Sequence, residues 1–103
     1  MTKDGTNHPL SAPEATRRIH EMARDPNVAR TFTGHARQRM REREVHADWV
    51  DQVLREGGVD EVRRENGTWR YRVVFVDKWG RTAVVTAIPS VDNLVIVTVT
   101  RSE

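Results

Sequence analysis

Residues 34 to 43, GHARQRMRER, place four arginines and one histidine within ten positions. At about 100° per residue, a helix over this stretch puts His35, Arg39 and Arg43 on one flank. An imidazole can transfer a proton near neutral pH, and a guanidinium binds phosphate oxygens through forked donors. The row therefore holds groups that could bind a phosphodiester and move a proton beside it. The alternative is a solvated amphipathic helix whose histidine is an incidental surface residue.

The use of arginine extends to the whole chain. Of the seventeen basic residues only Lys3 and Lys78 are lysines, although the net charge is just +2. The net charge is a weak argument for a polyanionic partner, whereas arginine suits forked contacts with phosphate or carboxylate. A genome rich in G and C would produce the same bias, so composition alone leaves a phosphate-binding function open.

Several classes of protein are excluded by what the sequence lacks. It contains no cysteine, so disulfides and thiolate metal sites are absent. The four histidines have no close pairing and no metal-ligand spacing, and there is no glycine-rich phosphate loop, nucleophile elbow or Rossmann fingerprint. No apolar stretch is long enough to span a membrane, and the start does not resemble a secretory signal. We therefore expect no metal, no cofactor and no membrane.

Three helices are expected in the first half of the chain. Residues 1 to 10 are polar and read as a flexible leader, and residues 11–103 as one domain. Ser11 can cap a first helix, which ends at Asp25-Pro26-Asn27. Its apolar stripe consists of Ala15, Ile19, Met22 and Ala23. Residues 28 to 33 are a link to a second helix, capped by Thr33 or Gly34 and ending near Arg43. A third helix starts near His46 or Ala47, stops at Gly57-Gly58, and carries Trp49, Val50, Val53 and Leu54 inward.

The second half changes to the period of β-strands. Four segments are rich in Val, Thr, Ile and aromatic residues: VDEVRRE, TWRYRVVFV, RTAVVTAIP and NLVIVTVT. Asn66-Gly67 is a strong hairpin signal, because both residues tolerate positive φ. Short connections of this kind require antiparallel neighbours. The sequence thus predicts an α+β domain, with about three N-terminal helices packed on a four-stranded antiparallel meander.

Alternation along the strands predicts one apolar and one polar face. Trp69, Tyr71, Val73 and Phe75 share a face, as do Val95, Val97 and Val99. The opposite face is expected to carry Arg70, Arg72, Thr98 and Thr100, with Thr86 as a further candidate. This face could bind a ligand, or it could be the solvated side of a half-buried sheet.

The stretch FTGHARQRMRER, the helix with Asp48-Trp49-Val50, WRYRV and the terminal VIVTV together resemble a small bacterial family. Its signature is His-Ala-x-x-Arg-Met-x-x-Arg, and it is described as a domain of unknown function. The family is similar in architecture to the barnase/EndoU/colicin/RelE-like (BECR) ribonuclease toxins. The resemblance covers residues 32 to 100. The family pattern has glycine where this chain has Glu44, a departure expected to affect only the turn.

The resemblance implies a ribonuclease toxin that cuts RNA without a metal, by attack of the 2′-hydroxyl on the phosphodiester. The implied catalytic residues are His35, for proton transfer, with Arg39, Arg43 and Thr98. The implied substrate-binding residues are Arg70, Arg72, Thr100 and Arg37. The second proton-transfer group stays unassigned.

The implied partners are RNA (tRNA, rRNA or mRNA) and a cognate antitoxin or immunity protein. The site of action would be the cytoplasm, reached in some cases as part of a secreted effector. Two alternatives remain open: a non-catalytic nucleic-acid- or ribosome-binding module, and a protein-interaction domain of the antitoxin or immunity type.

Overall fold

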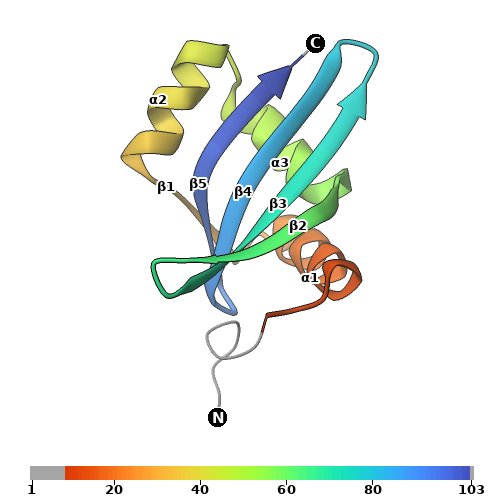
Figure 1. Cartoon of the computed structure of the whole chain (residues 1–103), viewed down its shortest axis with the longest axis vertical. Coiled ribbons are helices and arrows are strands. Elements are labelled where there is room, and N and C mark those ends of the chain that lie inside the picture. Colours follow the sequence, from red (N-terminus) through yellow and green to blue (C-terminus); the bar gives the residue numbers. More distant parts are fainter. Residues whose placement is uncertain (1–8, 103) are drawn as a thin grey trace.

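The computed structural model describes residues 9–102, so the expected leader lies, up to residue 8, outside the described part. Three helices pack on a five-stranded sheet, which confirms the α+β class (Figure 1). In chain order the elements are α1 (Ala12–Arg24), β1 (Ala29–Phe32), α2 (Gly34–Arg43), α3 (Ala47–Glu56), β2 (Gly58–Glu65), β3 (Thr68–Asp77), β4 (Gly80–Ser90) and β5 (Asn93–Ser102).

The strands β2 to β5 form the expected antiparallel meander. The order in the sheet is β1-β5-β4-β3-β2. Asn66 and Gly67 connect β2 to β3 with φ of 53° and 77°, the two positive values that a type I′ turn requires. The turn sets the register of the hairpin, in which Glu65 pairs with Thr68 and Arg63 with Arg70.

The sheet has one strand more than the sequence predicted. Residues 28 to 33 were expected to be a link, but Ala29–Phe32 forms β1, which pairs in parallel with β5. Ala29 lies opposite Asn93 and Phe32 opposite Ile96. The partner strand is more than sixty residues away in the chain, so four residues with little β pattern become a strand only because the edge of β5 is available.

The core lies between one face of the sheet and the helices α1 and α3. The four predicted apolar residues of α1 are all buried, and its cap is the predicted Ser11, whose hydroxyl accepts from the backbone N–H of Glu14. Leu54 in α3 is fully buried, as expected, whereas Met40 in α2 is only half-buried. Buried residues of α1, α3 and the sheet form a single cluster.

The helix α2 lies beside β5 rather than over the core face (Figure 1). Thr33 fixes its start: the Thr33 hydroxyl accepts from Ala36 N at 3.0 Å and donates to the carbonyl of Val97 at 3.1 Å. The backbone N–H of Thr33 also donates to the carbonyl of Ile96. The helix that carries the histidine and arginine row is therefore anchored directly on β5.

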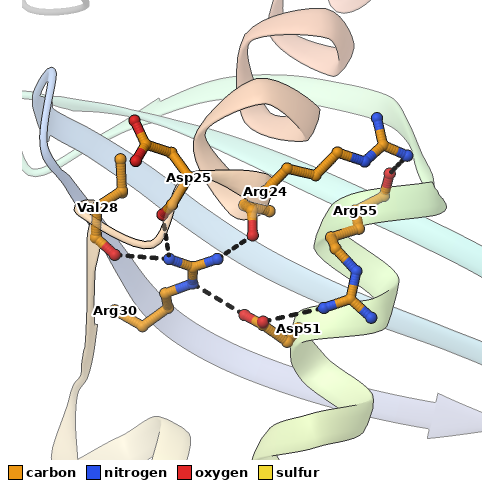
Figure 2. A network of polar contacts seen from close by, with 7 residues as sticks. Arg24, Asp25, Val28, Arg30, Asp51 and Arg55 are labelled. Atoms are coloured by element: carbon orange, nitrogen blue, oxygen red, sulfur yellow. Dashed lines mark hydrogen bonds and ion pairs between the residues drawn. The ribbon is translucent and has the colours of Figure 1, made fainter.

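The position of β1, and with it the start of α2, depends on a polar network around Arg30 (Figure 2). The Arg30 guanidinium donates to the Asp51 carboxylate of α3 at 2.9 Å and to the backbone carbonyls of Ala23, Asp25 and Val28. Asp51 also accepts from Arg55, and the carbonyl of Arg55 accepts from Arg24. A half-buried arginine thus joins the carbonyl of Ala23, in the last turn of α1, to β1 and α3.

Glu44 ends α2 in the left-handed conformation, with φ of 56° and ψ of 46°. This geometry costs an L-residue about 1–2 kcal/mol, and glycine adopts it without that cost. We expect Glu44→Gly to raise the free energy of unfolding by about 0.5–1 kcal/mol, since the greater flexibility of unfolded glycine offsets part of the gain. Glu44→Ala keeps the strain and serves as the control. Equal stability of the two variants in urea unfolding would contradict the prediction.

Candidate functional site

A small cavity lies on the face of the sheet that α1 and α3 leave open. Its volume is about 150 Å³, and four strands contribute side chains to it. The lining residues are Glu61, Arg63, Glu65, Arg70, Arg72, Val85, Val97 and Thr98. The structure thus brings together three of the predicted site residues, Arg70, Arg72 and Thr98. We call this feature the sheet cavity.

A β-bulge at Val97 changes the faces predicted for β5. Val85 and Thr86 are adjacent in β4, but they pair with Thr98 and Ile96, so Val97 is an extra residue in β5. Val97 and Thr98 consequently both line the sheet cavity. The expectation that Val95, Val97 and Val99 share the core face is therefore wrong. The buried residues of β5 are Leu94, Ile96 and Val99.

Thr86 and Thr100, two other threonines predicted for the open face of the sheet, do not line the sheet cavity. Thr86, a candidate for the open face, is fully buried on the helix side, opposite the buried Tyr71, and its hydroxyl donates to the carbonyl of Val95. That assignment is wrong. Thr100 is exposed and follows the open face, but it is not among the residues that line the sheet cavity.

Carboxylates neutralise much of the positive charge on the open face. Arg72 donates to both oxygens of Asp60, at 2.8 and 3.1 Å, and forms an ion pair with Glu61 at 3.2 Å. This hydrogen bond from Arg72 lowers the pKa of Asp60, and the same bond raises the pKa of Arg72. The pair therefore contributes stability above the usual pKa of an aspartate, and the contribution is lost as the pH falls through the lowered pKa of Asp60.

Arg70 has a mixed environment. Its Nη1 donates to Glu65 at 2.9 Å, while its Nε is buried and has no hydrogen-bond partner among the described residues. A buried donor without a partner is costly, and the arginine that carries it lines the sheet cavity.

The contribution of β2 to the sheet cavity was missed from the sequence. Arg63, Glu61 and Glu65 all line it. The signal was present in the hairpin: the two-residue Asn66-Gly67 turn pairs Arg63 with Arg70, and directly opposed residues of antiparallel strands project to the same face.

The predicted row on α2 is exposed to solvent. His35 and Arg43 are exposed, and Arg39 forms an ion pair with Glu42 at 2.9 Å. Hydrogen bonds from Gln38 and then from Arg39 lower the pKa of Glu42. Ala36 is buried beside the row, so this flank borders the packed side of the helix.

The structure does not join this row to the sheet cavity by a contact. Within residues 9–102, no hydrogen bond or ion pair links His35, Arg39 or Arg43 to Arg70, Arg72 or Thr98. The two regions are neighbours through the chain nonetheless. Thr33, two residues before His35, is bonded to the carbonyl of Val97, which itself lines the sheet cavity. The first turn of α2 thus begins at the β5 side of the sheet cavity.

Arg37 lies elsewhere. Its guanidinium is 5.6 Å from the ring centroid of Phe32, and it lines an open groove of about 560 Å³ at the corner between α2 and α3. The groove is lined by Arg37, Met40, Arg41, Glu44, Val45, His46 and Ala47. We call it the corner groove. It shares no lining residue with the sheet cavity.

Asp60 offers a test of whether the open face meets RNA. Removing its charge in Asp60→Asn leaves Arg72 and Arg81 less neutralised, because both guanidiniums bind this carboxylate. We expect affinity for a 2′-O-methyl RNA oligonucleotide to rise about threefold to fivefold, and the salt dependence to steepen by about one counterion. Asp48→Asn, an exposed aspartate on α3, should change neither quantity. Affinity is measured by anisotropy titrations at several salt concentrations. If the parent, Asp60→Asn and Asp48→Asn show the same salt dependence, Arg72 takes no part in RNA binding.

The described part of the chain contains no group of three or more His, Asp or Glu side chains placed to hold a metal ion. None of its helices is long and apolar enough to cross a membrane.

The model of one protein family, described as a domain of unknown function (DUF4258), matches residues 32–101 of the chain. The match begins at the end of β1 and includes α2, α3 and all four meander strands, so both the α2 row and the sheet cavity fall within it. Neither the curated proteins nor the solved structures contain a match.

Proposed function

We propose that this chain, a member of the DUF4258 family, is a metal-independent ribonuclease. The observation that supports this most directly is the sheet cavity, where arginines, carboxylates and a threonine hydroxyl converge. Phosphate, ribose hydroxyls and a transferable proton are the features of RNA that such a set of groups would recognise. The finer likeness to the BECR ribonuclease toxins is part of the same proposal.

In the proposed reaction the 2′-hydroxyl loses its proton to a carboxylate of the sheet cavity, for which Glu65 is the candidate. The 2′-oxygen forms a bond to phosphorus as the bond from phosphorus to the 5′-oxygen breaks. His35 gives a proton to that leaving oxygen, and the products are a 2′,3′-cyclic phosphate and a free 5′-hydroxyl. General acid–base catalysis of this reaction requires two proton-transfer groups, and in this proposal Glu65 and His35 supply them.

The arginines stabilise the charge that develops on the phosphate. Arg70 and Arg72 bind its oxygens within the sheet cavity, Thr98 binds phosphate or ribose there, and Thr100 extends the contact along β5. Arg39 and Arg43 continue the path over α2, one and two turns beyond His35. Donors fixed by ion pairs need little reorganisation as charge develops, which favours the transition state.

The biological setting follows the same proposal. A ribonuclease of this kind would act on cytoplasmic RNA and would harm its own cell without a cognate antitoxin or immunity protein. It could be one half of a toxin–antitoxin pair, or the toxic end of a secreted effector.

The test is cleavage of labelled total RNA in EDTA. We expect cutting that continues when magnesium is removed, and products that carry a cyclic phosphate. A 2′-O-methyl RNA of the same sequence is the matched control, since it lacks the nucleophile and should be bound but not cut. Intact RNA at high protein concentration would reject the nuclease, and cleavage that requires magnesium would reject the metal-free mechanism.

A non-catalytic nucleic-acid-binding module is the second candidate. The position of His35 favours it: this residue is exposed on α2 and is not among the residues that line the sheet cavity, so the arginines there could bind RNA without a histidine beside the phosphate. The same assay separates the two functions: this module would bind both RNAs equally and cut neither.

A further inference from the structure

The corner groove is a second concave surface that the ribonuclease proposal does not use. It lies where α2 ends and α3 begins, and its volume is about 560 Å³. Its apolar lining comes from Met40, Val45 and Ala47, with Met40 half-buried and Val45 buried. Methionine adapts its shape to different partners, so this lining suits an inserted apolar side chain.

Cations without carboxylate partners flank the groove. Within residues 9–102, neither Arg37 nor Arg41 has a carboxylate at ion-pair distance, although Arg39 on the same helix does. His46 adds a third basic side chain, and Glu44 is the single acid. The arginines of the open face are instead neutralised by neighbouring carboxylates. The corner groove therefore keeps its capacity to pair with anions from outside.

The walls of the groove are held in place by the fold. Arg37 lies over the ring of Phe32, and the backbone N–H of Val45 donates to the carbonyl of Met40 at 2.9 Å. The left-handed backbone at Glu44 makes the sharp turn between the two helices. A surface that is already ordered loses less entropy when a partner binds.

We propose that the corner groove binds an acidic segment of a partner protein, which inserts an aliphatic side chain between two or more carboxylates. The carboxylates pair with Arg37 and Arg41, and the inserted side chain covers Met40, Val45 and Ala47. RNA fits less well for two reasons. No Phe, Tyr or Trp ring lines the groove to stack a base, and its apolar lining of Met40, Val45 and Ala47 matches an aliphatic side chain rather than a sugar–phosphate backbone.

This interaction is independent of RNA cleavage, because the corner groove and the sheet cavity share no lining residue. A partner seated in the groove leaves the sheet cavity uncovered unless it also extends along β5. Binding is therefore measured in the absence of RNA, and failure of the ribonuclease proposal would not affect the result.

The test uses a fluorescein-labelled peptide of twelve residues, with one leucine between two pairs of glutamates and glycine and serine elsewhere. We expect saturable binding that weakens as salt is added. Replacing the leucine by serine should weaken binding about tenfold, and replacing the glutamates by glutamine should abolish it. Arg41→Glu should lower affinity for the parent peptide about tenfold or more, since a favourable charge pair becomes repulsive. Arg17→Glu, on an exposed turn of α1, is the matched control and should change affinity less than twofold.

Backbone amide chemical shifts of the labelled protein locate the site. The peptide should shift the amides of residues 40 to 47 and leave those of the sheet cavity unchanged. A dispersed spectrum of Arg41→Glu verifies that this variant is folded. The proposal is overturned if the leucine and serine peptides bind equally, if neither binds, or if a 2′-O-methyl RNA of twelve nucleotides shifts the same amides and loses affinity in Arg41→Glu. The last result would assign the groove to nucleic acid.

Discussion

Replacement of His35 by alanine should lower the rate of RNA cleavage by roughly 10²–10⁴-fold, the usual effect of removing a general acid or base. The physical reason is the leaving 5′-oxygen, which departs as a high-energy alkoxide unless a proton reaches it. His35 is exposed in the first turn of α2 and contributes nothing to the buried core. Its loss should therefore reduce turnover without reducing the folded fraction.

The measurement is single-turnover cleavage of a labelled RNA in EDTA, with the protein in excess, together with thermal unfolding of each variant. His46→Ala is the matched control, because His46 is also exposed near the start of a helix and makes no side-chain capping bond. We expect His46→Ala to cut RNA at the parent rate. If His35→Ala does so too, His35 has no part in the reaction and the acid must be sought within the sheet cavity.

Local signals in the sequence predicted those parts of the fold that local chemistry determines. Ser11 and Glu14 cap α1 through contacts three residues apart, and Asn66-Gly67 makes a turn that two adjacent residues define. The strand β1 could not be predicted in this way. Its hydrogen bonds go to β5 at the other end of the chain, and no pattern in its four residues indicates which strand they pair with.

The two faces of the sheet were predicted from the alternation of side chains along each strand, and this alternation is interrupted where a bulge adds a residue. The side chains of β5 alternate regularly up to Ile96 and again from Thr98. Between these two parts the extra residue Val97 changes which face each side chain points to. Arg70 and Arg72 were placed correctly because β3 pairs with β4 without such an interruption. The bulge also gives the sheet cavity two adjacent lining residues from one strand.

The helix and the strands that carry the candidate site residues were predicted, but the way these elements meet was not. The phase of α2 follows from helix geometry, so the row of His35, Arg39 and Arg43 was read correctly. Whether that row meets the arginines of β3 depends on how α2 is anchored, which Thr33 and the network of Arg30 determine through contacts distant in sequence. Helix periodicity contains no information about those contacts.

Gly57→Ala should lower the free energy of unfolding by about 3 kcal/mol, at the upper end of the usual cost of overpacking a core. A Cβ at Gly57 would lie 2.7 Å from the carbonyl oxygen of Val74, 2.8 Å from that of Val53 and 2.9 Å from Cγ1 of Val73. Two of these three neighbours are backbone atoms, which no change of rotamer can move. The φ of Gly57 is −80°, so the cost comes from lack of space and not from backbone conformation.

The chain provides its own control in the next residue. A Cβ at Gly58 would have no heavy atom within 4 Å, and Gly58→Ala should stay within about 0.5 kcal/mol of the parent. Urea unfolding of the two variants compares equal changes in composition at adjacent positions.

The carbonyl of Gly57 also accepts a hydrogen bond from His20 of α1, so displacing this residue disturbs α1, α3 and β3 together. Because β2 begins at the next residue and carries Glu61, Arg63 and Glu65 into the sheet cavity, any displacement that Gly57→Ala tolerates should also weaken the RNA binding that we propose for this cavity. Equal stability of Gly57→Ala and Gly58→Ala would show that α3 and β3 are not packed as closely as these distances require.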